Sequence, residues 1–139
     1  MAENENKKNQ YNSDIQSNNV QIQKMEELYE SLKLFKHKVE EAKEQFISIK
    51  SSRKIMLDDL ISDAPNCDVV KKYSNGAKKS LNEVGMTYVK GTFFSLVTVI
   101  NAKLLEYKMV IAIKEAENVR LANLIKELDD DINDEESEG

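Results

Sequence analysis

The sequence is poor in residues that break helices and in residues that build catalytic or metal sites. Its 139 residues include one Pro, four Gly, one Cys, one His and no Trp. So few Pro and Gly residues favour a small number of long helices. The single cysteine, Cys67, excludes an intramolecular disulfide and a cysteine metal cluster, and His37 has no second His or nearby Cys with which to hold a metal. We therefore expect no enzymatic activity, no metal and no cofactor.

Membrane and export signals are also missing from the sequence. The first 19 residues contain no apolar stretch of the kind found in secretory signal peptides. The longest nearly apolar run, residues 93–100, is much shorter than the roughly 20 residues that span a bilayer. We expect a cytoplasmic protein without a membrane span, and we keep open export by a route that needs no cleaved signal.

Charge is distributed unevenly along the chain. The net charge is −5, but residues 127–139 hold eight acidic residues and no basic one, so residues 1–126 carry +3. Acidic side chains at the C-terminal end of a helix oppose its dipole, which predicts a disordered acidic tail over residues 133–139. The polar segment 1–19, with six Asn, is likewise predicted to be disordered. The weakly basic remainder has no basic and aromatic motif, so we expect no nucleic-acid binding.

Two long segments carry apolar residues at alternating spacings of three and four, which is typical of helices that pack as coiled coils. The first segment covers about residues 20–61, and the second covers about residues 86–131. Because such a helix needs a partner of similar length, we predict an all-α protein in which residues 20–132 form an antiparallel helical hairpin or coiled coil. The predicted first stripe is Met25, Leu28, Leu32, Phe35, Val39, Ala42, Phe46, Ile49, Arg53, Met56 and Leu60. The predicted second stripe is Met86, Val89, Phe93, Leu96, Ile100, Leu104, Tyr107, Ile111, Lys114, Asn118, Leu121, Ile125, Leu128 and Ile132.

A short broken helical connector is predicted between the two long helices. Pro65 is expected to end the first helix, because the residue before a proline avoids the α region. A short helix is expected from about Asp68 to Tyr73, since Ser74-Asn75-Gly76 looks like a helix C-cap. The sequence leaves open whether residues 68–84 form a third packed helix.

The second long segment is more apolar than a two-helix hairpin requires. Between residues 93 and 113, 15 of 21 residues are apolar, whereas one buried face needs about three positions in seven. The connector could cover the surplus as a third helix, but it is too short to cover the whole length. We therefore favour another chain as the cover. The predicted partner-binding residues are Phe94, Val97, Leu105, Met109 and Ile113.

A further set of residues, Tyr73, Gly76, Gly85, Tyr88 and Gly91, precedes the second stripe. This pattern resembles the small helical partners of LXG-domain toxins in type VII secretion, a group similar to the Trp-x-Gly helical hairpins. Val89 stands where the Trp of that signature is often found. The resemblance implies an adaptor or targeting factor that binds a helical domain of a larger secreted toxin, with Tyr73, Gly76, Tyr88 and Gly91 as turn or motif residues. The alternative is a self-associating coiled-coil scaffold, so a hetero-oligomer is expected and a homodimer stays open.

Overall fold

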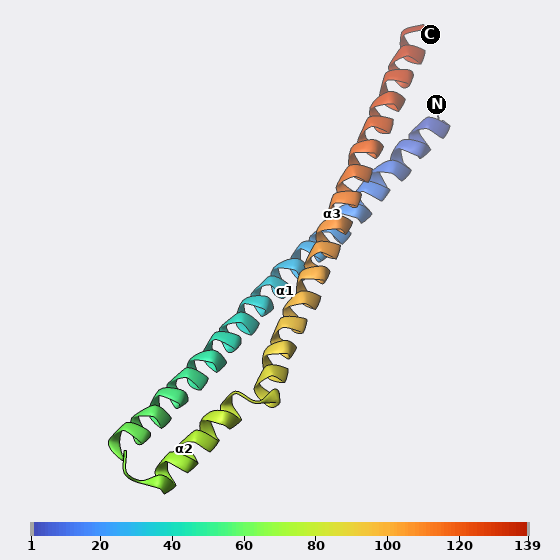
Figure 1. Ribbon diagram of the computed structural model, residues 1–139. Coiled ribbons are helices and arrows are strands. Elements are labelled where there is room, and N and C mark those ends of the chain that lie inside the picture. Colours follow the sequence, from blue (N-terminus) through green and yellow to red (C-terminus); the bar gives the residue numbers. More distant parts are fainter. Residues whose placement is uncertain (1, 139) are drawn as a thin grey trace. The chain divides into compact units, whose positions relative to one another are not determined.

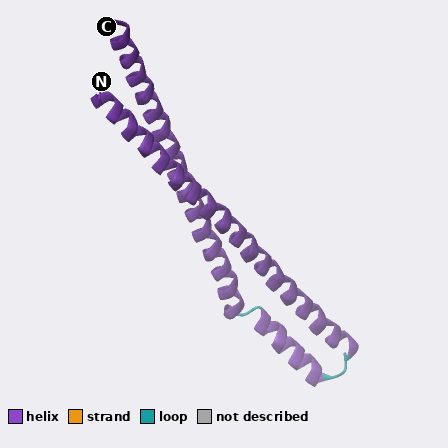
Figure 2. Ribbon diagram, turned by 180° about the vertical axis from the view of Figure 1, so that it is seen from behind, coloured by secondary structure: helices purple, strands orange, loops and turns teal. Residues whose placement is uncertain are grey.

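The protein is all-α, as the sequence predicts. The computed structural model describes residues 2–138, with only the backbone described at residues 84 and 85. It consists of helix α1 (Ala2–Asp63), helix α2 (Asp68–Leu81) and helix α3 (Val84–Glu138) (Figure 1). Within residues 2–138 there is no strand, and the non-helical residues are confined to the two short connections 64–67 and 82–83 (Figure 2). None of the helices in this range is long and apolar enough to cross a membrane.

The connector is helical and broken at both ends, as predicted, but its boundaries differ from the prediction. The Ala64 amide still donates to the Leu60 carbonyl at 3.2 Å, and Pro65 then stops α1. The extended backbone of Cys67 precedes α2, which ends where the Asn82 amide donates to the Lys79 carbonyl at 3.0 Å. Ser74-Asn75-Gly76 therefore does not cap a helix but lies inside α2. Packing of the apolar side of α2 overrides the weak helix preference of Gly76.

By their internal contacts the three helices form two units. The first unit contains α1 up to Leu32 and α3 from Ala102, and these two segments run antiparallel. The Lys8 ammonium lies 2.6 Å from the Asp129 carboxylate, and further along α1 the Asn18 amide donates to the Asn118 side chain at 2.9 Å. Their interface is centred on Leu121, which is 3% exposed, and on Asn18, which is 5% exposed.

The second unit contains residues 33–101, which are the rest of α1, α2 and the start of α3. The rings of Phe46 in α1 and Phe93 in α3 lie 6.1 Å apart and mark the antiparallel pairing here. Helix α2 joins this unit as a packed helix, with Leu81 buried and Lys78 paired with Asp58 of α1. Among the described side chains of the unit, Val39, Leu57 and Ile100 are also buried apolar residues. A third helix therefore exists, which answers the question that the sequence left open.

Only four of the eleven residues predicted for the stripe on α1 turn inward, and the other seven are exposed. The positions that turn inward at alternating spacings of four and three are Met25, Tyr29, Leu32, Lys36, Val39, Lys43, Phe46 and Lys50. One neighbouring helix covers two adjacent rows of side chains, so the row of Leu28, Phe35, Ala42, Ile49 and Met56 stays exposed, as do Arg53 and Leu60. The prediction counted apolar residues alone, whereas lysines also pack by their methylene stems and keep their ammonium groups in water.

The stripe predicted on α3 agrees with the structure at nearly every position. Of its members only Leu96 is exposed, and the half-buried residue at that level is Val97. The inward rows of α3 therefore pass through Phe93, Val97, Ile100 and Leu104. Val97 is half-buried, whereas the sequence placed it among the surplus side chains outside the predicted stripe.

Both chain ends are helical where the sequence predicted disorder. The segment predicted as disordered over residues 1–19 belongs to α1 from Ala2 onward, and the tail predicted over residues 133–139 belongs to α3 as far as Glu138. Met1 and Gly139 lie outside the described residues. The polar N-terminal segment lies beside the acidic end of α3, where Lys8 pairs with Asp129, so each polar end supplies the neighbour that the other needs. Residues 133–138 are all exposed.

Gly91 lies inside α3, and a Cβ atom added there would meet nothing within 4 Å. Gly91→Ala should therefore raise the free energy of unfolding by about 0.5–1 kcal/mol, because alanine loses less backbone entropy in a helix. Urea unfolding followed by circular dichroism measures the change, and Gly76→Ala in α2 should behave in the same way. A clear loss of stability would show that Gly91 is needed for a conformation other than this helix.

The polar layer of the first unit should contribute to stability. Asn118 accepts from Asn18 and donates to Asn19, both at 2.9 Å. Asn118→Ala leaves the buried Asn18 amide without this partner and should lower the free energy of unfolding by about 1–3 kcal/mol. Asn123→Ala, at an exposed position of the same helix, should change it by no more than about 0.5 kcal/mol. Equal effects of the two substitutions in thermal melts would contradict a stabilising layer.

Candidate protein-binding surface

Large exposed apolar side chains are the most distinctive feature of the surface. Of the five side chains predicted to bind a partner, Phe94 is 69% exposed, Leu105 60%, Met109 56% and Ile113 62%. The fifth, Val97, is half-buried against α1. Four of the five predicted residues are therefore available on the surface of α3, although they belong to different units.

Helix α2 does not cover this surplus. It lies in the same unit as Phe94 and packs against α1 through Leu81 and Lys78, and Phe94 remains largely exposed. The connector therefore does not remove the apolar excess of α3 from solvent. Exposed aliphatic and aromatic groups of this size make α3 a candidate interaction surface.

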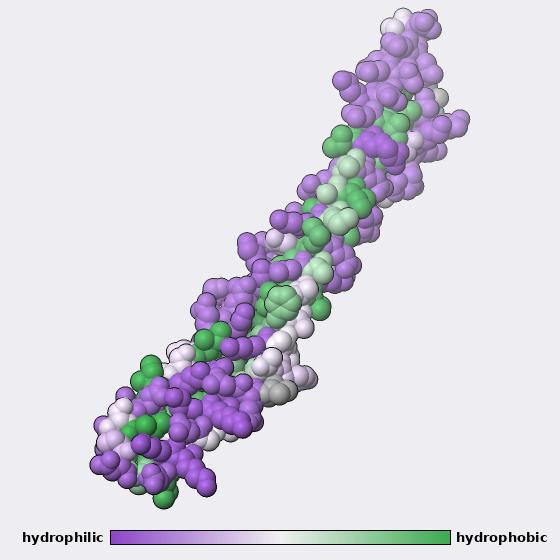
Figure 3. All heavy atoms as spheres, in the orientation of Figure 1, coloured by the Kyte–Doolittle hydropathy of each residue, from purple (hydrophilic) through white to green (hydrophobic). Residues whose placement is uncertain are grey.

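A second exposed apolar surface lies on α1, where the sequence placed part of the hairpin interface. The α1 apolar row consists of Leu28, Phe35, Ala42, Ile49 and Met56, which recur every seven residues. All five are exposed. If the lysine stems are counted with the apolar residues, α1 carries three adjacent rows of side chains that can pack. A single neighbouring helix covers two of them, so the third row is expected to be exposed. Figure 3 shows hydrophobic side chains reaching the surface in a broken line between hydrophilic ones.

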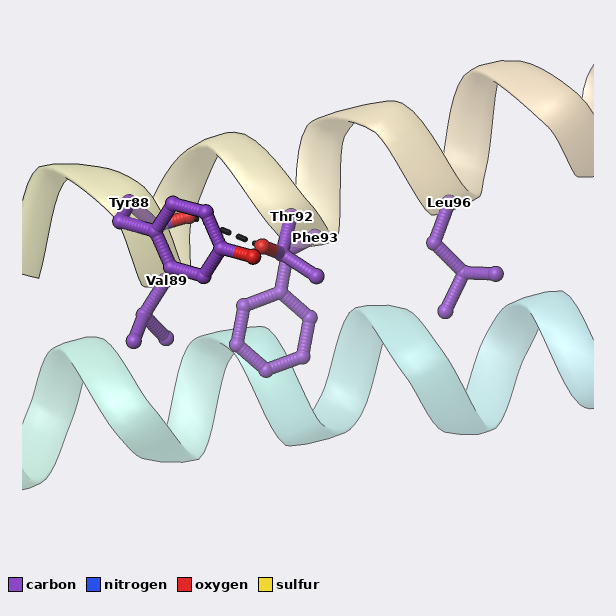
Figure 4. Close-up of a pocket in the computed structure, with 5 residues that line it drawn as sticks. All are labelled: Tyr88, Val89, Thr92, Phe93 and Leu96. Carbon is purple, nitrogen blue, oxygen red and sulfur yellow. Dashed lines mark hydrogen bonds between the residues drawn. The ribbon is translucent and has the colours of Figure 1, made fainter.

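An open apolar depression lies at the start of α3 in the second unit. Tyr88, Val89, Thr92, Phe93 and Leu96 line it, and Figure 4 shows Val89, Phe93 and Leu96 directed toward α1. The Thr92 hydroxyl donates to the Tyr88 carbonyl at 3.0 Å, which satisfies this polar group beside the apolar floor. The depression could accept a single apolar side chain from a partner helix.

The predicted turn residues do not form a turn. Tyr73 and Gly76 lie within α2, and Tyr88 and Gly91 lie within α3. Both tyrosines are largely exposed, and none of the glycines in the described residues has a positive φ. Tyr73 and Tyr88 therefore add aromatic surface to the second unit and do not shape a bend.

The electrostatics of the second unit are dominated by lysines. Lys36, Lys43 and Lys50 recur every seven residues along α1 and are half-buried. Lys36 has Glu40 at 3.9 Å, whereas the ammonium of Lys50 faces those of Lys90 and Lys54. Partial burial, and then the neighbouring charge of Lys90, lower the pKa of Lys50 below its ordinary value of 10.5. Positive charge is therefore crowded at one point of this unit.

Residues that could hold a metal do not come together. Across residues 2–138 there is no group of three or more His, Cys, Asp or Glu side chains placed around a common point. His37 is exposed and lies 3.1 Å from Glu41 on the same helix, and Cys67 is exposed in the α1–α2 connection. The surface thus offers apolar and basic groups for recognition.

Comparison with known proteins does not assign the chain to a family, so its class is described by its fold and its surface. None of the family models, curated proteins or solved structures compared with the chain matches it. The chain is an all-α helical hairpin with exposed apolar rows on both long helices.

Crowding at Lys50 should cost stability at neutral pH. The pKa of Lys50 is lowered in the folded chain, so folding disfavours its charged form; the penalty is present below the folded pKa and is relieved as pH rises toward 10.5. Lys50→Met should therefore raise the melting temperature at pH 7, and its advantage over the wild type should shrink as the pH rises toward 10.5.

Lys36→Met is the matched control, because Lys36 has an acidic neighbour and the same half-buried position. It should leave the melting temperature unchanged or lower it. A Lys50→Met variant that melts below the wild type would show that the ammonium groups do not repel each other in the folded chain.

Proposed function

We propose that this chain is a non-enzymatic adaptor that binds a helical domain of a larger secreted protein, an LXG-type toxin, and presents it for type VII secretion. The observation that carries the proposal is the exposure of large apolar side chains on α3, which are Leu105, Met109 and Ile113 in the first unit and Phe94 in the second. Burying a side chain of this size contributes about 1.5–3 kcal/mol, so a partner that covers several of them gains most of an interface.

Helices are the partners that best suit these surfaces. Exposed apolar residues at heptad spacing on α1 and at helical spacing on α3 accept the matching row of another helix, as in helix-in-groove recognition. Binding of this kind needs no catalytic group and no cofactor. In this proposal the adaptor meets its partner in the cytoplasm, and the complex leaves the cell by a route that needs no cleaved signal.

The alternative proposal is a self-associating scaffold. The same exposed rows are present on every copy of the chain, so two copies could cover each other in a four-helix arrangement. Co-expression with the helical N-terminal domain of a large protein encoded beside this gene separates the two proposals. A heteromeric complex supports the adaptor, and a homodimer that ignores the domain supports the scaffold.

Charge placed on the exposed α3 side chains should abolish the complex without unfolding the chain. Leu105→Glu combined with Ile113→Glu removes two anchors that are each about three-fifths exposed, so the isolated protein should stay helical by circular dichroism. Co-purification with the helical domain should be lost.

The control is Gln21→Glu combined with Ser31→Glu, which adds the same charge at exposed positions of α1 in the same unit. It should leave the complex intact. Retention of the complex by the Leu105/Ile113 double variant would place the interface elsewhere, and its unfolding would mean that these side chains belong to the core.

A further inference from the structure

The second unit presents apolar and basic side chains together on one side of the α1–α3 pair. Phe46 and Phe93 face each other at 6.1 Å. A helix turns by about 100° per residue, and in an antiparallel pair the residues that follow two facing side chains turn toward the same side. Ile47 and Phe94 are those residues, and they are 39% and 69% exposed. Ile47 and Phe94 therefore lie on the same side of the α1–α3 pair, outside its interface.

Lysines border this pair of apolar side chains. Lys50 lies one turn beyond Phe46 on α1, and Lys90 lies nearly one turn before Phe93 on α3, so the two lysines lie at the same level of the antiparallel pair. The charge of Lys90 there acts on Lys50. Lys54 lies a further turn along α1 and also acts on Lys50. We call Ile47, Lys50, Lys54, Lys90 and Phe94 the basic-apolar patch.

Among the ion pairs of the described residues, none involves Lys50, Lys54 or Lys90. Neither Lys50 nor Lys90 has an acidic residue three or four positions away on its own helix. Lys54 has Asp58 at that spacing, but Asp58 pairs with Lys78 of α2. In contrast, Lys36 and Lys103 each have a glutamate within 4 Å on their own helix. Helix surfaces usually place such glutamates beside lysines, because the pair stabilises the helix.

The net charge of the whole second unit is also positive. The second unit, residues 33–101, holds twelve basic and eight acidic residues, a net charge of +4. The first unit holds eight basic and seventeen acidic residues, a net charge of −9. The basic-apolar patch therefore lies in a unit with a net positive charge, although the whole protein has a net negative charge.

We infer that the basic-apolar patch binds a partner helix whose apolar row is flanked by carboxylates. This inference rests on the proposed function and names the chemistry of the partner. The apolar row covers Ile47 and Phe94, while carboxylates beside it bond the ammonium groups of Lys50, Lys54 and Lys90. Charge complementarity of this kind selects among helices that share the same apolar spacing.

A second copy of the chain fits the patch less well than a separate partner. Its densest acidic segment is residues 127–138, where the large apolar residues are Leu128 and Ile132. Both are half-buried within the first unit and are not available to cover Ile47 and Phe94. The segment thus offers carboxylates without an exposed apolar row.

Neutralising the patch tests the inference. Lys50→Gln combined with Lys90→Gln removes two positive charges, and the control Lys71→Gln combined with Lys72→Gln removes two from exposed positions of α2 in the same unit. The probe is the helical N-terminal domain of the large protein encoded beside this gene, with affinity measured by calorimetry at 50 and 300 mM NaCl. The patch variant should bind about tenfold or more weakly at low salt and should lose most of the salt dependence. The control should stay within about twofold of the wild type.

The possible outcomes separate the inference from the proposed function. Circular dichroism should show that the patch variant is at least as stable as the wild type, so weaker binding would not reflect unfolding. Unchanged binding by a folded patch variant overturns the inference alone. Failure of the wild type to bind the domain overturns both. A wild-type homodimer in sedimentation that the patch variant loses would assign the patch to a second copy, which also overturns it.

Discussion

The antiparallel contact between α1 and α3 is the constraint on which the other features of the structure depend. A single neighbouring helix covers two adjacent rows of side chains, and both long helices carry apolar groups on more than two. In the first unit, Asn18 and Asn118 bond inside this contact. A partly buried amide pair favours one alignment, because sliding the helices would leave the buried Asn18 amide without this partner. The alignment then determines which rows face solvent.

The exposed rows follow from that alignment and connect the fold to recognition. On α1, the inward turn of Tyr29, Lys36 and Lys43 leaves Leu28 and Phe35 on the outside. On α3, the inward rows take Val97 and leave Phe94 exposed. The covered rows of α1 include lysines, so part of the contact between the two helices is made by lysine methylene groups. Fully apolar side chains remain for another molecule.

The basic groups extend the same logic from affinity to selectivity. An interface made only of aliphatic side chains at helical spacing would accept many helices. Lys50 and Lys90 meet without an acidic neighbour on their own helices, so a helix that brings carboxylates relieves a repulsion that already exists in the free chain. The proposed partner site and the repulsion between Lys50 and Lys90 therefore lie at one place in the second unit.

The sequence by itself determined the all-α class, the two long helices, the break at Pro65 and nearly all of the inward rows of α3. These features depend on the spacing of apolar residues and on Pro65, which has no backbone N–H. Both act within one helix and do not depend on its neighbours. Only the tertiary structure decided which rows of α1 are covered, that Val97 lies inside while Phe94 lies outside, and that the polar segment 2–19 is helical. Each depends on the neighbour: lysine stems can replace apolar side chains at a contact, and Lys8 at one chain end meets Asp129 near the other. Gly76 likewise remains helical because α2 packs against α1, a contact that residue spacing alone does not contain.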